Sequence, residues 1–271
     1  MGFLEHLDEL RSRIIRACVA VGLGMCASLF FYERLGNFVL EPTLRALPPG
    51  SELIFTRPSE MFAFYFNVAL IGGVVLAAPF VSYQVWRFVS PGLHQREKQL
   101  VVPFVTLATL GAVGGVAFSH YVLFPSSIAF FGAFTSPHVR FMPRVEDIFD
   151  QYLKMMLGMV VVFQLPPVVF VLARVGAVTA SSMWRHFKYA VLVVFILSAV
   201  LTPSPDAWNQ IAFAAPMLGL YVLSIGIAYL AGSGQVTPVG TDHLRLVFAA
   251  TVLQSASRNR SRPSWGGRLV R

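Results

Sequence analysis

The sequence predicts an all-α integral membrane protein with six transmembrane helices and both termini in the cytoplasm. Of its 271 residues, 56% are hydrophobic and only 13% are charged, whereas soluble domains carry about 25% charged residues. Long apolar runs recur along the chain, and arginine and lysine concentrate in every second link between them. Cytoplasmic loops carry such an excess of basic residues, so this asymmetry sets the orientation.

The chain begins with an amphipathic segment, residues 1–13, in which leucines recur at three- and four-residue spacing. That spacing predicts a cytoplasmic helix with one apolar stripe. Glu9 precedes Arg13 by four residues, which on a helix allows a local ion pair. A membrane domain follows over residues 14–230. Residues 231–271 form a basic tail that we predict to be disordered, because arginines alternate there with serine, glycine and proline.

Six apolar runs are candidates for the spans, because about 20 apolar residues in a helix cross the ~30 Å hydrocarbon core. They cover residues 14–32, 62–86, 101–124, 155–173, 189–201 and 211–230. We expect the last two helices to be short. Residues 189–201 reach only about 20 Å as a helix, so local thinning of the bilayer is expected. The links 33–60 and 125–151 are predicted to be outer loops, and 202–210 a short outer link.

Basic residues mark the inner links and account for the net charge of +8. Outside the tail, those that lie before the first span, near its start or in the inner links are Arg11, Arg13, Arg16, Arg87, Arg96, Lys98, Arg174, Arg185 and Lys188. Membrane orientation and contact with anionic lipid explain this charge better than nucleic acid does. The sequence contains no serine-hydrolase elbow, phosphate-binding loop or metal-ligand cluster. We therefore predict no nucleic-acid partner, no enzymatic activity, no metal and no cofactor.

Three motifs carry a resemblance to a known family. They are HLDELRSR at residues 6–13, YQVWRFVSPGL with REK and VVP at residues 83–103, and LTPSPD at residues 201–206 with Gln210 after it. In this order, and between these apolar runs, they resemble the TatC family, the membrane receptor subunits of the twin-arginine protein translocase. The resemblance extends from about Leu4 to about Leu230. It implies a concave bundle of six helices.

The resemblance also implies the function and the partners. It implies a core subunit that recognises the twin-arginine signal peptides of folded precursors and works in the bacterial cytoplasmic (inner) membrane. The partners that it implies are TatB-like and TatA-like single-span subunits, with self-association in a multimeric receptor complex. The energy source that it implies is the proton-motive force.

Four residues are implied as the signal-peptide site: Glu9, Arg11, Phe88 and Glu97. Glu97 is the only acid in the link Trp86–Lys98. On spacing alone it is a solvated charge or a local ion pair, because exposed pairs contribute only ~0–1 kcal/mol. The resemblance changes this interpretation, because two adjacent arginines present planar forks that match carboxylates, which lysine cannot do. Glu9 and Glu97 then become the expected partners of the arginine pair, with Phe88 beside them.

Three further polar residues are candidates for contacts. Gln164 lies within the fourth run, where a polar side chain normally faces protein or a cavity. Gln164 is expected either to make an interhelical hydrogen bond or to provide a polar contact on the concave face of the protein. TatC-like sequences often carry glutamate at this position. Because glutamine cannot ionise, we expect no proton relay at Gln164. Asp206 and Gln210 are predicted to contact partner helices at the outer rim, although Asp206 is equally well interpreted as a helix N-cap.

A secondary transporter for a small solute is the alternative function. Gln164, Asn67 and the proline-broken spans favour it, but such transporters usually contain internal repeats and midplane charges, and neither is visible here. A structural membrane scaffold is a third possibility, and it would tolerate the loss of Glu97. Retention of a twin-arginine precursor during purification distinguishes a receptor from a transporter.

Overall fold

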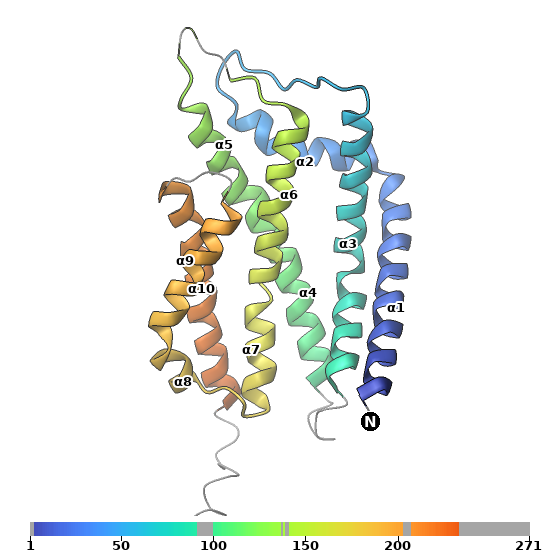
Figure 1. The fold of residues 1–271 in the computed structure, drawn as a ribbon, viewed down its shortest axis with the longest axis vertical. Coiled ribbons are helices and arrows are strands. Elements are labelled where there is room, and N and C mark those ends of the chain that lie inside the picture. The colour runs from blue at the N-terminus through green and yellow to red at the C-terminus, as the bar shows by residue number, and fades with distance from the viewer. Residues whose placement is uncertain (1–2, 91–99, 137, 139–140, 203–206, 233–271) are drawn as a thin grey trace, which may run out of the picture. The chain divides into compact units, whose positions relative to one another are not determined.

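The regular elements of the described chain are helices. The structure is a computed structural model, and it describes residues 3–90, 100–136, 138, 141–202 and 207–232 (Figure 1). In chain order the elements are α1 (Phe3–Leu29), α2 (Tyr32–Ala46), α3 (Glu60–Val89), α4 (Val101–Phe118), the π-helical turn η3 (Ser119–Leu123), α5 (Phe124–Gly132), α6 (Val145–Val162), α7 (Leu165–Arg174), α8 (Ala180–Arg185), α9 (Phe187–Leu201) and α10 (Ala207–Gly232).

Within this described part, five helical stretches are long and apolar enough to cross a membrane. They are Glu5–Leu29, Glu60–Phe88, Val101–Gly132, Val145–Arg174 and Asn209–Gly232. α9 is a shorter apolar helix of 15 residues. The predicted all-α membrane fold is confirmed, whereas the count of six spans stays a prediction.

The amphipathic amino-terminal segment and the first apolar run form one continuous helix. α1 contains 27 residues, and no proline interrupts its sequence. It packs against α3, which lies beside it in Figure 1. Only 6% of its apolar window is buried. α1 is therefore a peripheral helix that depends on α3 for its position.

The predicted outer loop 33–60 is wrong over its first part, which forms helix α2. This helix runs across the outer ends of the long helices (Figure 1). It buries Gly36, Val39, Pro42 and Thr43, a spacing of three and four residues that gives a helix one packed face. The buried face consists mainly of small side chains, so its hydropathy does not stand out among the charged residues around it.

The predicted outer loop 125–151 is wrong as well, because most of it is helical. α4 continues through η3 into α5, and α6 already begins at Val145. Pro125 follows η3 directly at the start of α5, and within this continuous stretch it removes one intrahelical hydrogen bond, which bends a helix. A π-helical turn such as η3 inserts an extra residue into a helix without ending it. The outer link is consequently confined to residues 133–144.

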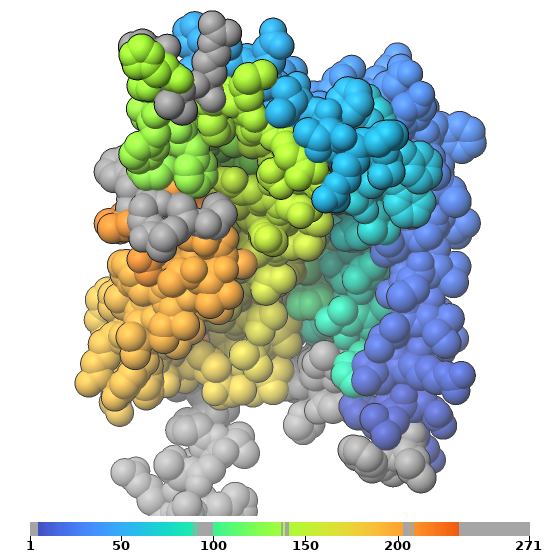
Figure 2. Space-filling model, turned by 45° about the horizontal axis from the view of Figure 1, so that its top comes forward, coloured from blue at the N-terminus to red at the C-terminus, as the bar shows by residue number. Residues whose placement is uncertain are grey.

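α6 is the most buried of the long helices. Half of the apolar window in Val145–Arg174, 50%, is buried. Tyr152, Met155 and Met159 pack inside, and the ring centroids of Tyr152 and Phe124 are 5.0 Å apart. One face of this stretch remains open: Leu157, Val161, Leu165 and Val168 are exposed. Figure 2 shows the surface of α6 and α7 between α3 and α9.

The prediction that the last two helices are short is right for α9 and wrong for α10. α10 contains 26 residues and begins inside the predicted polar link. Asn209 and Gln210 belong to its first turn, because backbone hydrogen bonding continues a helix through polar residues. Asp206 lies outside the described residues.

The start of α1 and the ends of α3, α7 and α10 lie at one end of the helices (Figure 1). The segments of α1, α3 and α7 at this end carry the basic residues Arg11, Arg13, Arg16, Arg87 and Arg174, so we infer that this end is cytoplasmic. We expect single cysteines at Ser51 and Ser136, in the outer links, to react with an impermeant maleimide in intact cells. A cysteine at Ser257, in the tail, should not react.

The labelling requires a Cys18→Ala, Cys26→Ala background, because both native cysteines are free and exposed. The same variants in permeabilised cells provide the control, since all three sites should then react. Reaction at Ser257 in intact cells would contradict the cytoplasmic carboxyl terminus and the even number of spans.

Candidate functional site

α1 and α3 approach each other closely at a pair of glycines. A Cβ at Gly24 would lie 2.7 Å from the carbonyl oxygen of Gly73, and a Cβ at Gly73 would lie 2.5 Å from the amide nitrogen of Met25. Small residues of this kind let two helix backbones approach. The contact holds the helices side by side and brings together residues near their cytoplasmic ends.

The first polar cluster at this end consists of Glu9 and Arg13 of α1 and Gln84 of α3. Arg13 Nη2 lies 2.9 Å from Glu9 Oε1, and Arg13 Nη1 donates to Gln84 Oε1 at 3.4 Å. The side chains of Arg13 and Glu9 are 13% and 18% exposed. The ion pair follows from its four-residue spacing. The sequence did not predict the contact with Gln84, because no local pattern links it to Arg13, 71 positions away.

A second contact between the same helices is the stack of His6 on Phe88. The ring centroids are 4.5 Å apart and the interplanar angle is 20°. Trp86 is buried against Phe104 of α4, with centroids 5.1 Å apart. Trp86 therefore anchors the end of α3, while Phe88 stays half-buried at its edge. Nothing in the sequence pattern singles out His6 as the partner of Phe88.

The four predicted signal-peptide residues are placed unequally. Glu9 and Phe88 both lie at the cytoplasmic end of the α1–α3 pair, and each belongs to a contact that joins the two helices. Arg11 is exposed on α1. Glu97 lies outside the described residues. We call the cytoplasmic end of α1 and α3, with Glu9, Arg13, Gln84, His6 and Phe88, the α1–α3 site.

Gln164 lies where the stretch Val145–Arg174 breaks between α6 and α7. Its Nε2 donates to the carbonyl oxygen of Ala108 in α4 at 3.2 Å. Gly111 permits the approach, because a Cβ there would lie 2.6 Å from the carbonyl oxygen of Phe163. Gln164 thus makes an interhelical hydrogen bond, one of the two interpretations left open by the sequence. Such bonds contribute roughly 0.6–2 kcal/mol in membranes, so this residue no longer favours a transporter.

The outer end of α10 is joined to the middle of α9 by a hydrogen bond from Gln210 Nε2 to the carbonyl oxygen of Phe195 at 3.2 Å. The middle of α10 is tied to α8, where the Tyr221 hydroxyl donates to the carbonyl oxygen of Met183 at 3.0 Å. α9 exposes an apolar row made of Leu192, Val193, Ile196, Leu197 and Val200. This row is a candidate surface for another membrane helix.

A buried carboxylate joins the two outer links. Glu60 accepts hydrogen bonds from the amide nitrogens of Thr56 and Glu146, both at 3.0 Å, and lies 3.4 Å from Arg144 Nη2. Burial lowers the pKa of Arg144, but the carboxylates of Glu60, Asp147 and Glu146 outweigh it and raise the pKa above its ordinary value. These hydrogen bonds and ion pairs connect the outer link that precedes α3 with the outer link that precedes α6.

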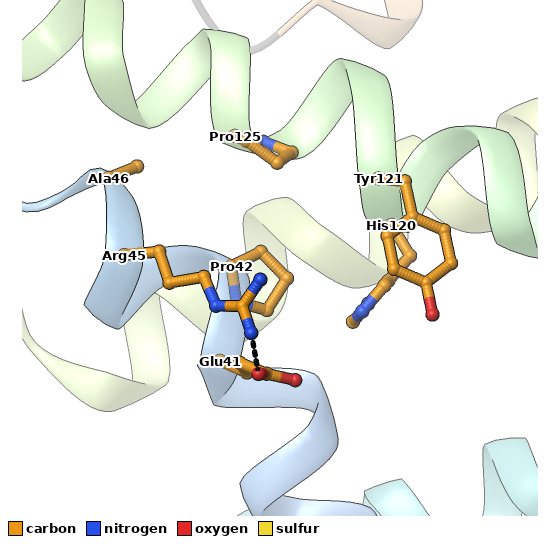
Figure 3. Close-up of a pocket in the computed structure, with 7 residues that line it drawn as sticks. All are labelled: Glu41, Pro42, Arg45, Ala46, His120, Tyr121 and Pro125. Atoms are coloured by element: carbon orange, nitrogen blue, oxygen red, sulfur yellow. Dashed lines mark hydrogen bonds and ion pairs between the residues drawn. The ribbon is translucent and has the colours of Figure 1, made fainter.

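A pocket of about 280 Å³ opens between α2 and the turn η3 (Figure 3). It is lined by Glu41, Pro42, Arg45, Ala46, His120, Tyr121 and Pro125. Glu41 and Arg45 pair with each other, and Nδ1 of the buried His120 lies 3.2 Å from the Tyr152 hydroxyl. No predicted site residue lines this pocket. Among the described residues, no group of three or more His, Cys, Asp or Glu is arranged to hold a metal ion.

Comparisons with known proteins agree with the motifs. A family model described as Sec-independent protein translocase protein (TatC) matches residues 5–216. A protein of that name from Koribacter versatilis is 39% identical over 235 residues, which is 85% of this chain and 86% of the relative. Another from Desulforapulum autotrophicum is 39% identical over 223 residues, 82% of each chain.

Two solved structures are similar as well. A crystal structure of the twin-arginine translocase receptor TatC has a TM-score of 0.71 and 29% identity, and the match covers 83% of this chain and 99% of that one. A second crystal structure of this receptor, in DDM, has a TM-score of 0.73 and 28% identity, covering 82% and 99%.

Proposed function

Because the chain belongs to the TatC family, we propose that it is a receptor and core subunit of a twin-arginine translocase in the bacterial cytoplasmic membrane. It recognises the signal peptides of folded precursors at the α1–α3 site together with Glu97. One observation carries this placement. Glu9 and Phe88, which are far apart in the sequence, both lie at the cytoplasmic junction of α1 and α3.

The α1–α3 site has the chemistry that a pair of arginines requires. Guanidinium groups bind carboxylates through two parallel hydrogen bonds, which an ammonium group cannot reproduce. Glu9 is largely shielded from water, so a pair formed there is weakened less than one on an open surface. Glu97 is proposed as the second carboxylate. Phe88 provides an apolar ring for the peptide segment beside the arginines, and Arg11 belongs to the same proposed site.

We expect the purified protein to bind a fluorescent twin-arginine signal peptide and to bind its twin-lysine counterpart at least about tenfold more weakly, a difference of ~1.4 kcal/mol. Affinity should fall as salt rises, because the Debye length shortens from about 10 Å at 0.1 M to about 3 Å at 1 M. Fluorescence anisotropy in detergent at several salt concentrations measures both effects. Equal affinity for the two peptides would reject the proposal.

The same proposal includes single-span TatB-like and TatA-like partners, self-association, and transport driven by the proton-motive force. We place the docking edge for partner helices on α9 and α10, with Asp206 and Gln210 at its outer rim. The exposed apolar row of α9 supports this choice, because one further helix covers such a row by close packing. In addition, α9 is shorter than the hydrocarbon core, so the bilayer beside it is expected to be thinner.

Photo-crosslinking tests the docking edge between Met183 and Tyr221. Crosslinkers at Leu192 and Val200, which face outward, should capture a TatB-like protein. A crosslinker at Val194, which is buried in the same helix, should not. Crosslinks that appear only on α1, for example at its exposed Leu23, would place the partner elsewhere.

A further inference from the structure

The two proposed ligand-binding residues of the α1–α3 site already contact residues of the chain itself. Glu9 holds a guanidinium group, that of Arg13, and Phe88 holds the planar ring of His6. We propose that Arg13 is an internal competitor, which occupies Glu9 in the empty receptor and is displaced by an arginine of the signal peptide. This inference rests on the proposed function, and it assigns to Arg13 a role in setting the affinity of the receptor for its ligand.

Arg13 is positioned to leave Glu9 without losing every partner. Its Nη2 contacts Glu9, whereas its Nη1 donates to Gln84 on the neighbouring helix. Gln84 is only 4% exposed, so its oxygen stays in place as a fixed acceptor. Arg13 Nε is buried and has no hydrogen-bond partner among the described residues. The guanidinium is therefore held at its two terminal nitrogens, one of which remains bonded when Glu9 is taken.

The remaining bond to Gln84 lowers the cost of the exchange. A charge that loses its partner in a shielded setting is strongly destabilising. A displaced Arg13 that is still bonded to Gln84 keeps one acceptor and avoids part of this penalty. Gln84 is thus the acceptor that makes the displacement reversible.

Competition at Glu9 lowers the affinity of every ligand by the same factor. An incoming group can bind Glu9 only in the fraction of receptors whose Arg13 has left it, and that fraction does not depend on the ligand. The preference for arginine over lysine therefore comes from the ligand: an incoming arginine replaces the lost pair with a chemically equivalent one, whereas a lysine supplies only a compact and strongly hydrated point charge.

The first test replaces Arg13 with glutamine, which removes the competing charge and keeps a side chain able to bond Gln84. We expect the Kd of the twin-arginine peptide to fall about two- to fivefold, as for the loss of an ion pair worth up to ~1 kcal/mol. The Kd of the twin-lysine peptide should fall by a similar factor, so that the ratio of the two Kd values stays the same. Arg16→Gln removes the same charge from an exposed position of α1 and should leave both Kd values unchanged.

The second test uses Gln84→Met, which keeps the volume but removes the acceptor. A displaced Arg13 then has no partner, so binding of the twin-arginine peptide should weaken. In the double variant with Arg13→Gln this weakening should disappear, because no guanidinium has to be released. Simple additivity of the two substitutions would overturn the proposal.

Two other outcomes would also overturn it. Weaker binding of both peptides by Arg13→Gln, at unchanged thermal stability, would make Arg13 a positioning residue for Glu9. Unchanged Kd values for both peptides would make it a bystander. Should the glutamine variant fail to fold, Arg13→Lys keeps the charge without the fork, and it should lower both Kd values to a smaller extent. A failure confined to the variants leaves the proposed function intact, whereas loss of arginine preference in the unaltered protein rejects that function itself.

Discussion

Replacing Glu97 with alanine or glutamine is expected to abolish binding of the twin-arginine peptide while the protein stays inserted and folded. The Kd should rise about thirtyfold or more, because removing one partner of a hydrogen-bonded charge pair costs about 2–5 kcal/mol. Loss of one loop carboxylate should change stability little, as exposed pairs contribute only ~0–1 kcal/mol. Peptide anisotropy and thermal unfolding, measured on the same detergent preparation, separate the two effects.

Three companion variants sharpen this result. Glu97→Asp should be milder, since the carboxylate survives but reaches less far. Glu52→Gln removes the same charge from an exposed position in an outer link and should leave binding unchanged. Glu97→Lys should recover binding only with a peptide that carries a compensating glutamate. Full peptide binding by purified Glu97→Ala would falsify the assignment of this residue.

Gly73→Leu is expected to have the largest effect on the fold. Its Cβ would lie 2.5 Å from the amide nitrogen of Met25 and 2.8 Å from the carbonyl oxygen of Val21. Backbone atoms cannot rotate away, so the side chain must push α1 off α3. Overpacking of this kind costs about 1–3 kcal/mol, occasionally more. Since the α1–α3 site spans the separated helices, the melting temperature and the peptide affinity should fall together.

Gly22→Leu provides the matched control on the same helix. Nothing lies within 4 Å of a Cβ at Gly22, so the added side chain extends into open space. Its melting temperature and peptide affinity should match those of the unaltered protein. If Gly73→Leu behaves like this control, the glycine contact is not what holds the two halves of the site together.

Hydropathy was sufficient to predict the long helices and insufficient for those that cover the outer ends. α3 and residues 155–173 of the stretch Val145–Arg174 contain long apolar runs, so composition alone identifies them. The first turns of α6 are acidic and for that reason resemble a loop. α2 buries Gly36 and Thr43, which contribute to close packing but little to a hydropathy pattern. α5 starts at Phe124 with Pro125 behind it, and a proline there is compatible with either a loop or a first helical turn.

The candidate site was predictable only where its pattern is local or belongs to a family motif. The pairing of Glu9 with Arg13 follows from the geometry of one helix. The partners across the junction, Gln84 and His6, depend on how α1 and α3 are aligned along each other. That alignment is set by a contact between backbones at two glycines, so no side-chain pattern in either helix encodes it.

The most direct test of the proposed signal-peptide site is to map which residues of the protein a bound signal peptide contacts. A twin-arginine peptide carrying a photoreactive group beside the arginine pair can be bound to the purified protein, irradiated and mapped by mass spectrometry. We expect crosslinks in α1 near Glu9, in α3 near Phe88 and in the link that carries Glu97. Unlabelled twin-arginine peptide should compete with them, and twin-lysine peptide should not. Crosslinks confined to α9 and α10, or to the outer links around Glu60, would contradict a signal-peptide site at the junction of α1 and α3.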